Sequence, residues 1–383
     1  MKIITNGIVF KDGKWLKDVD IVMEDNIIEG IVNTRSDIEG IDVELIDAEG
    51  GYVCPGFINI HIHGAMGYDV MDGTEEAIRE IGKFSAQHGT TSFLPTTVTG
   101  SIESTKKTLK KIEMVMREGY EGANILGTHL EGPFIAREYK GAQMEVYIQE
   151  PSIENYLKLV GDFGNIVKLV TIAPELEGAK DLIEYLKGQD VHVSMGHTGA
   201  DYDTCIEAFK WGVSHVTHCY NGMVPLHHRN PGVIGAAFDR KDITIELITD
   251  LIHIHPAMLR LAMRTKGAEG TAIITDSMSA TGLGDGKYLL GEEDVWVKNG
   301  IARTAEGSLA GSTLTQDKAL KNIVDIGIPL AAGVEMLSTT PAKVIGVDTY
   351  KGRIEAGYDA DIIILDKRDL QVRHVFIQGR QFK

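Results

Sequence analysis

Short runs of β-branched and other apolar residues, separated by turn-forming residues, occupy both ends of the chain. In the first 53 residues these runs predict strands at Lys2–Phe10, Val19–Glu24, Ile27–Val32 and Val43–Asp47. Two more strands are predicted near the other end, at Asp361–Asp366 and Gln371–Gln378. Neither end alone could bury much apolar surface, so we predict that both ends fold together into one small β domain.

Between the two ends, the pattern changes to apolar strands that alternate with amphipathic helices. Eight strands are predicted, at Phe57–His63, Thr91–Pro95, Ile125–Glu131, Val167–Ala173, Val191–Met195, His215–His218, Ile243–Thr249 and Thr271–Asp276. Apolar residues at a spacing of three to four predict helices at Glu75–His88, Ser104–Arg117, Ile153–Val160, Ala179–Lys187, Asp201–Trp211, Pro256–Arg264 and Gln316–Ile326. Between the sixth and seventh strands we expect no helix, only a loop over Tyr220–Asn230.

Eight consecutive strand and helix units favour a closed (β/α)8 barrel, or TIM barrel, over an open doubly wound sheet. We therefore predict an α/β fold in two parts. Residues 54–341 would form the barrel, and residues 1–53 and 342–383 would form a small β-sandwich domain from both termini.

The composition narrows the classes of partner. The 383 residues include 38 basic and 55 acidic side chains, a formal net charge of −17, with no basic tract. This charge argues against nucleic acid or an anionic membrane as the main partner, and an acidic substrate would need a local cationic pocket. No apolar run reaches the ~18 residues of a membrane span. The three cysteines are an odd number that suits a reducing cytosol, so we expect a cytoplasmic protein.

Imidazole and carboxylate side chains gather where the predicted strands end, which is where a barrel of this type carries its chemistry. The residues found there are His61, His63, Glu131, His197, His218 and Asp276. His61 and His63 are two residues apart, so on a strand both point to the same face. Alone, such a pair is more often structural, Glu131 could be a loop carboxylate, and Asp276 could cap a turn.

Together, these six side chains predict a metal centre. So many imidazoles and carboxylates in one closed rim would be costly to desolvate without a cation that neutralises them. Cys219 follows His218 but faces the other side of the strand, and His192 and His215 lie early in their strands. We interpret these three residues as structural.

A cationic loop follows the sixth strand. Arg229 lies in the segment His227-His228-Arg229-Asn230-Pro231-Gly232 of an otherwise acidic chain. A guanidinium at this place could hold a phosphate group through two parallel hydrogen bonds. The alternative is a solvated loop arginine.

Several short motifs stand at the strand ends. They are Pro55-Gly-Phe-Ile-Asn-Ile-His-Ile-His-Gly64, His129-Leu-Glu-Gly-Pro133, Met195-Gly-His-Thr198, Thr217-His-Cys-Tyr-Asn-Gly-Met223, Asp276-Ser-Met278 and Leu309-Ala-Gly-Ser312. The first motif resembles the amidohydrolase superfamily. The others, in this order, resemble more specifically the N-acetylglucosamine-6-phosphate deacetylases within it. The resemblance covers nearly the whole chain, because Gly352–Asp361 also resembles the segment that returns such chains to a small β domain.

The resemblance implies a metal-dependent hydrolase with one or two divalent ions per subunit. A first ion would be held by Glu131, His197 and His218. A second would be held by His61, His63 and Asp276, with Glu131 as the bridge. Zn²⁺ or Fe²⁺ are the first candidates, followed by Co²⁺ or Mn²⁺. The resemblance also implies a homodimer.

The implied reaction converts N-acetyl-D-glucosamine 6-phosphate to D-glucosamine 6-phosphate and acetate, in amino-sugar catabolism. Asp276 would take a proton from the attacking water and deliver it to the departing nitrogen. The implied substrate contacts are Ala142, Gln143, Asn221, Gly222, Arg229, His253, Leu309, Ala310 and Gly311. Some relatives have a histidine in place of Gln143, and glutamine can donate a hydrogen bond but not a proton.

Two alternatives remain at this point. A cyclic amidase of the dihydroorotase or hydantoinase type would bridge two metals with a carboxylated lysine at the end of the fourth strand. Here Lys168 stands at the start of that strand. A non-catalytic barrel that serves as an assembly subunit would usually lack metal ligands, whereas all six candidate ligands are present in this chain.

Overall fold

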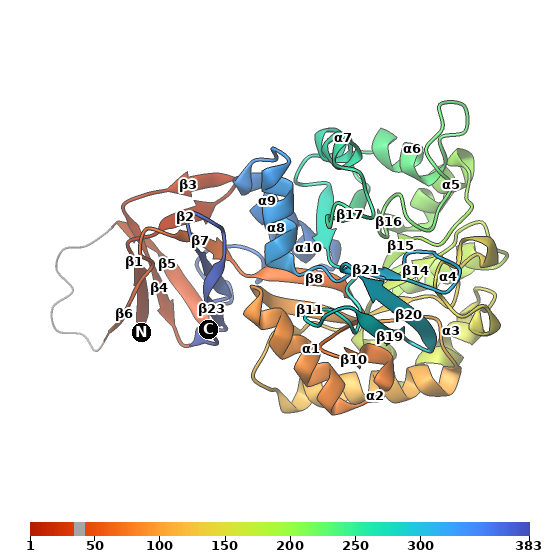
Figure 1. Cartoon of the computed structure of the whole chain (residues 1–383), viewed down its shortest axis with the longest axis horizontal. Helices are drawn as coiled ribbons and strands as arrows, with labels where there is room; N and C mark the ends of the chain where they lie inside the picture. Colours follow the sequence, from red (N-terminus) through yellow and green to blue (C-terminus); the bar gives the residue numbers. More distant parts are fainter. Residues whose placement is uncertain (34–42) are drawn as a thin grey trace.

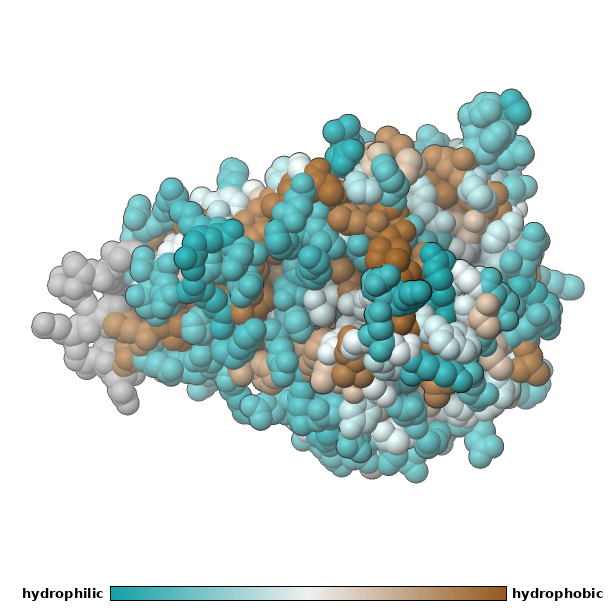
Figure 2. Space-filling model, in the orientation of Figure 1, coloured by the Kyte–Doolittle hydropathy of each residue, from teal (hydrophilic) through white to brown (hydrophobic). Residues whose placement is uncertain are grey.

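The structure, a computed structural model, describes residues 1–33 and 43–383; residues 34–42, which belong to the predicted small domain, lie outside this description. Figure 1 shows a small all-β part that contains both chain ends, beside a larger part of strands and helices. In the described ranges no helix has the length and apolarity needed to cross a membrane. Figure 2 shows one mainly hydrophilic face, with a band of apolar residues over the larger part.

The larger part is a barrel of eight parallel strands. These strands are β8 (Phe57–Ile62), β11 (Thr90–Thr97), β13 (Thr128–Glu131), β14 (Val167–Ile172), β15 (His192–Met195), β16 (Val213–Val216), β17 (Thr244–Ile248) and β18 (Thr271–Ile274). Each strand pairs in parallel with the next. A parallel bridge between Ile62 and Ser277 brings the end of β18 back to β8. The predicted α/β barrel is therefore confirmed.

Seven helices lie where the apolar spacing predicts them, with ends that agree within two residues. They are α1 (Glu75–Gln87), α2 (Ile102–Glu118), α3 (Ile153–Val160), α4 (Ala179–Gly188), α5 (Tyr202–Trp211), α7 (Pro256–Lys266) and α8 (Gln316–Asp325). In α1, the Thr74 hydroxyl accepts a hydrogen bond from the Ala77 N–H over 3.2 Å, which caps the first turn. Ile78 and Ile81 lie on the face that is fully buried against the barrel.

Among the described residues, the apolar pattern missed three helices, a three-stranded sheet and several short strands. A helix, α6 (Gly232–Asp239), follows the loop after β16, so the expectation of no helix between the sixth and seventh strands is wrong. Its segment Gly-Val-Ile-Gly-Ala-Ala-Phe-Asp is apolar on nearly all sides and therefore shows no amphipathic period. The other two missed helices are α9 (Leu330–Leu337) and α10 (Thr339–Val344), and the missed three-stranded sheet consists of β19 (Gly286–Leu290), β20 (Glu293–Lys298) and β21 (Ile301–Arg303).

Short elements cover the rim at the carboxyl ends of the barrel strands. The β19–β21 sheet packs its buried Leu290 and Val295 against Val98 and Met278 in a separate apolar cluster.

The remaining short strands of the larger part are β9 (Gly64–Ala65), β10 (Tyr68–Asp69) and β12 (Asn124–Ile125). The 3-10 helices are η1 (Val70–Asp72), η2 (Arg137–Tyr139), η3 (Glu145–Tyr147) and η4 (Gly161–Ile166).

The smaller part is a sandwich of two sheets, with strand orders β5-β4-β1-β6 and β24-β23-β22-β7-β2-β3. Its strands are β1 (Lys2–Thr5), β2 (Ile8–Lys11), β3 (Lys14–Leu16), β4 (Val19–Glu24), β5 (Ile27–Asn33), β6 (Glu44–Asp47), β7 (Tyr52–Pro55), β22 (Ile362–Leu365), β23 (Val372–Ile377) and β24 (Arg380–Gln381). Cys54 of β7 pairs with Ile363 of β22, so the C-terminal segment completes a sheet that the N-terminal segment begins. The predicted β-sandwich from both termini is confirmed, while the boundaries near residues 54 and 341 stay predictions.

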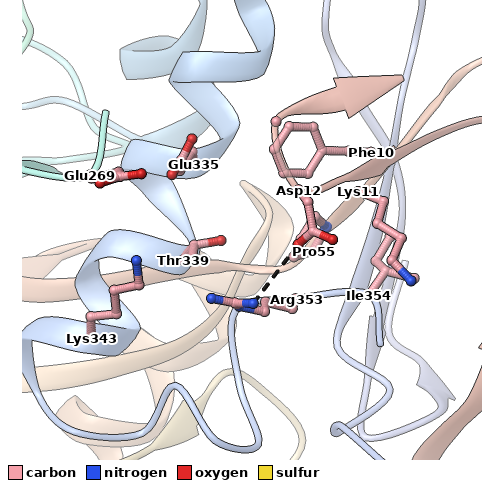
Figure 3. A pocket seen from close by; sticks show the side chains of 11 residues that line it. Phe10, Lys11, Asp12, Pro55, Glu269, Glu335, Thr339, Lys343, Arg353 and Ile354 are labelled. Atoms are coloured by element: carbon pink, nitrogen blue, oxygen red, sulfur yellow. Dashed lines mark ion pairs between the residues drawn. The ribbon is translucent and has the colours of Figure 1, made fainter. Parts of the chain in front are cut away.

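A cavity of about 250 Å³ lies where the small part meets α9 and α10. Figure 3 shows Asp12 and Arg353 on one side of this cavity, with Glu335 and Lys343 on the other. Oδ1 of Asp12 lies 3.8 Å from Nη1 of Arg353, a loose ion pair. The described lining residues include acidic and basic side chains but no histidine, so the candidate metal ligands lie elsewhere.

Candidate metal centre and active-site cavity

Glu131, His197 and His218 form one buried group at the carboxyl end of the barrel. Their ligand atoms lie within 4.8 Å of one another. Oε1 of Glu131 lies 3.0 Å from Nε2 of His197 and 2.9 Å from Nε2 of His218, and the two Nε2 atoms are 3.1 Å apart. A single cation could therefore contact one atom of each residue.

His61, His63 and Asp276 form a second group beside the first. Nε2 of His63 lies 3.1 Å from Nε2 of His61 and 3.1 Å from Oδ1 of Asp276. Oε2 of Glu131 lies 3.5 Å from Nε2 of His63, while its Oε1 faces the first group. The Glu131 carboxylate thus lies between the two groups, and the structure brings all six predicted ligands together.

Sharp turns at the ends of three strands place His197, His218 and Asp276. All three residues have a left-handed backbone, with φ angles of 47°, 26° and 48°. The turn at Asp276 is held by a hydrogen bond from its N–H to the carbonyl of His61 (3.0 Å) and by one from the Ser312 N–H to its own carbonyl (2.7 Å). Such backbone conformations cost about 1–3 kcal/mol each and concentrate at functional sites.

In each of the four imidazoles, Nδ1 is the ring nitrogen that points away from the cluster, and it donates a hydrogen bond to a fixed oxygen. The Nδ1–H of His63 donates to the carbonyl of Thr96 over 3.1 Å, and that of His197 donates to the carbonyl of Tyr139 over 2.7 Å. The Nδ1–H of His218 donates to the carbonyl of Asn221 over 3.1 Å. The Nδ1–H of His61 donates to the carboxylate of Glu246 over 3.0 Å. Because these oxygens only accept, each Nδ1 carries a proton, and in its neutral form each ring turns the lone pair of Nε2 toward the cluster. A metal-binding imidazole needs this tautomer.

The charges in the cluster compensate one another. Burial lowers the pKa of His63 and His218, but the neighbouring carboxylates overcome this effect and raise both values to about 9. Burial raises the pKa of Glu131, but the imidazoles of His61 and His197 hold it well below the ordinary range. Among the described residues that line the cavity above, no lysine or arginine adds positive charge. A divalent cation fits this donor set, since it can replace imidazole protons as the balancing charge.

A cavity of about 380 Å³ opens over the ligand cluster. The predicted substrate contacts that line it are Ala142, Gln143, Asn221, Gly222, His253, Leu309 and Gly311. Ala310, by contrast, is buried in the apolar cluster with Met278. Arg229 is exposed on the loop after β16, where its Nη1 lies 2.9 Å from Nε2 of His228, and it does not line the cavity.

Comparison with known proteins agrees with this geometry. The family model described as "Amidohydrolase family" matches residues 52–382. The chain belongs to the amidohydrolase family. This amidohydrolase is 37% identical over 367 residues to the N-acetylgalactosamine-6-phosphate deacetylase of Escherichia coli O157:H7, covering 96% of this chain and 95% of the relative. It is 36% identical to the N-acetylglucosamine-6-phosphate deacetylase of Vibrio furnissii, with 96% and 91% covered.

The backbone of the amidohydrolase also resembles a solved structure over nearly its whole length. This structure is a mutant of the N-acetyl-D-glucosamine-6-phosphate deacetylase from Mycobacterium smegmatis in complex with N-acetyl-D-glucosamine-6-phosphate. The two chains superpose with a TM-score of 0.90 at 29% sequence identity, covering 100% of this chain and 99% of the other.

In the amidohydrolase, Gln143 contacts the carboxylate of Glu131 directly. Its Nε2 donates a hydrogen bond to Oε2 of Glu131 over 2.9 Å. Its Oε1 accepts a hydrogen bond from the Thr99 N–H over 2.8 Å and another from the Thr99 hydroxyl, which fixes the orientation of the amide. Gln143 therefore holds Glu131 in place, while one edge of its side chain still lines the cavity.

The sequence did not predict several described residues that shape this site, among them Tyr220, Thr99 and Glu246. Tyr220 lines the cavity. Thr99 holds the side-chain amide of Gln143, and Glu246 accepts a hydrogen bond from Nδ1–H of His61. Glu246 carried a signal, because an acidic residue stands inside the otherwise apolar core pattern of Thr244-Ile-Glu-Leu-Ile248. A carboxylate in such a strand needs buried partners. Thr99 and Tyr220 lie in loops, where no periodicity indicates which side chains meet.

Proposed function

We propose that this amidohydrolase removes the acetyl group from an N-acetylated amino-sugar 6-phosphate. The substrate of this proposal is N-acetyl-D-glucosamine 6-phosphate, and the products are D-glucosamine 6-phosphate and acetate. The observation that carries the proposal is the pair of ligand groups joined by Glu131 beneath a cavity of small-molecule size. The names of the relatives, for the glucosamine and galactosamine forms, support the substrate class.

The proposed metal ligands are the six clustered side chains, which would hold one or two divalent ions. Zn²⁺ and Fe²⁺ are the first candidates, because both suit imidazole and carboxylate donors; Co²⁺ and Mn²⁺ follow. A bound ion would supply a water of lowered pKa and would polarise the acetyl carbonyl. The position of Glu131 between the groups supports it as the bridge, since Lys168 lies at the opposite end of β14.

Asp276 is the proposed proton carrier. Its side chain is 12% exposed, whereas the other five proposed ligands are at most 8% exposed, so its carboxylate has the best access to the cavity. It can take a proton from the water that attacks the acetyl carbonyl and then give that proton to the departing nitrogen. Because an amine is a poor leaving group without that proton, one carboxylate serves both halves of the reaction.

Residues around the cavity would bind and orient the sugar. His253 donates its Nδ1–H to Asp250 over 2.7 Å, which fixes the ring and leaves Nε2 free for the substrate. Asn221 and Gly222 lie three and four residues after His218 and add an amide side chain and backbone groups to the lining. We propose Arg229, on the same loop, for the 6-phosphate, because an anion in a chain of net charge −17 needs a local cation.

A homodimer in the cytoplasm completes the proposal. The cytoplasmic location is supported by the three cysteines, which are all free and buried in the structure. Thiols that stay unpaired suit a reducing compartment. The homodimer rests on the resemblance of the motifs to the deacetylase family.

The test compares acetate release from N-acetyl-D-glucosamine 6-phosphate, from its galactosamine epimer and from unphosphorylated N-acetylglucosamine. The proposal expects release that depends on the phosphate and is fastest with the glucosamine form. No acetate from any of the three would overturn the proposed activity. Equal rates with and without phosphate would overturn the phosphate site, and faster release from the galactosamine form would overturn the choice of epimer.

A further inference from the structure

Glu246, in β17, is a fully buried carboxylate beneath the ligand cluster. Its Oε2 accepts a hydrogen bond from Nδ1–H of His61 over 3.0 Å and another from the backbone N–H of His218 over 3.0 Å. Its backbone carbonyl also accepts from the Cys219 N–H over 2.9 Å. Glu246 therefore connects the backbone at His218 and Cys219 to the imidazole of His61.

These contacts join the two ligand groups from below, because His61 and His218 belong to different groups. From this geometry we infer that Glu246 is a positioning residue that sets the affinity of the centre for its divalent ion. The inference deepens the proposed function, since it rests on the proposed metal ligands. Glu246 itself makes no contact with the cavity and acts through the two histidines.

The hydrogen bond to His61 fixes which imidazole nitrogen faces the cluster. With the Nδ1–H donated to the carboxylate, Nε2 presents a lone pair; without an acceptor at Nδ1, the proton is free to move to Nε2 and block a ligand position. The hydrogen bond to the His218 N–H holds a residue whose φ angle is 26°, a conformation that local packing must sustain. Loss of Glu246 therefore disturbs one ligand of each group.

The surroundings of Glu246 argue against a purely structural explanation for a carboxylate at this place. Its neighbours in β17, Ile245 and Leu247, are fully buried apolar residues. A buried carboxylate in such a strand is costly to desolvate, and an apolar side chain would pack without that cost. The remaining oxygen, Oε1, lies 3.3 Å from Nε2 of His215, so a second imidazole lies beside the carboxylate.

The experiment compares two variants with a matched control. Glu246→Met keeps the volume and removes both acceptor oxygens, and Glu246→Gln keeps one acceptor oxygen without the charge. Gln316→Met is the control: Gln316 is a buried amide whose hydrogen bonds go to Thr90 and Ile58, away from the ligands. For each protein, Zn²⁺ affinity is measured by competition with a chelator, together with Zn²⁺ bound per chain, Tm and acetate release.

We expect Glu246→Met to bind Zn²⁺ about 10–100-fold more weakly than the unmodified protein, with a smaller loss for Glu246→Gln. The control should lose thermal stability but keep its Zn²⁺ affinity. Affinity unchanged in the Glu246 variants, or lowered equally in the control, would overturn the positioning role. If Glu246→Met fails to fold, the affinity of Glu246→Gln decides. An unmodified protein that binds no Zn²⁺, Fe²⁺, Co²⁺ or Mn²⁺ would instead overturn the proposed metal centre itself.

Discussion

Nε2 of Gln143 donates a hydrogen bond to Oε2 of Glu131 over 2.9 Å, so an amide holds the carboxylate that lies between the two ligand groups. Gln143→Leu removes that donor and also leaves the buried N–H of Thr99 without its acceptor. We expect metal affinity and kcat to fall about 10–100-fold, the usual effect of losing a side chain that orients a metal ligand.

The control for Gln143→Leu is Gln189→Leu, a change of the same chemistry at an exposed position after α4. Metal content and steady-state kinetics are measured for both proteins. Wild-type metal affinity in Gln143→Leu would contradict the positioning role and would leave Gln143 as a substrate contact alone.

Replacement of Asp276 by asparagine tests the proton transfers. Asp276→Asn keeps the shape of the side chain but removes the carboxylate that we propose takes and returns the proton. We expect kcat for acetate release to fall about 10²–10⁴-fold, with a much smaller change in KM. Asp181→Asn, at an exposed position in α4, is the matched control. Near-normal turnover by Asp276→Asn would refute the assignment.

The sequence predicted the six-residue cluster because its signals are local. The carboxyl ends of all barrel strands meet at one rim, so a residue at a strand end is expected there. Two residues that are two positions apart on a strand point to the same face, so His61 and His63 were expected side by side. The contact between Glu246 and His61 could not be predicted in the same way. It joins two residues that are 185 positions apart, and it depends on the closure of the barrel, which leaves only β18 between β8 and β17.

Two other features escaped prediction for different physical reasons. α6 is apolar on nearly all sides, so its pattern shows no face that distinguishes a helix from a loop. Arg229 lies on a long loop, where no period constrains the direction of a side chain, and the structure leaves it exposed beside His228. Its role toward phosphate therefore stays a prediction that needs its own test.

Arg229→Ala provides that test. Loss of a charge-assisted hydrogen bond costs about 1.5–3 kcal/mol, which corresponds to a rise in KM of about 10–100-fold for the phosphorylated substrate. The same change should leave the slow reaction of the unphosphorylated sugar unaltered. Arg240→Ala, which removes a partly exposed arginine paired with Asp242, is the control. Equal effects of Arg229→Ala on both substrates would contradict a contact with phosphate.

The three cysteines should be unreactive in the folded protein. Cys54, Cys205 and Cys219 are buried, and burial raises the pKa of the Cys205 and Cys219 thiols to about 12. Since the thiolate is the reactive form, a disulfide reagent at pH 8 should label none of them within minutes and all three after denaturation. Rapid labelling of the native protein would show that one of these thiols reaches solvent.

We expect the buried cluster around Glu131 to hold a divalent ion that deacetylation requires. This requirement is tested by measuring acetate release from N-acetyl-D-glucosamine 6-phosphate after removal of metal with a chelator and again after addition of Zn²⁺, Fe²⁺, Co²⁺ or Mn²⁺. Bound metal is counted in the same samples. Turnover should be lost on removal and should return in proportion to the one or two ions bound per chain. Full turnover by the metal-free protein would show that deacetylation does not require the ion.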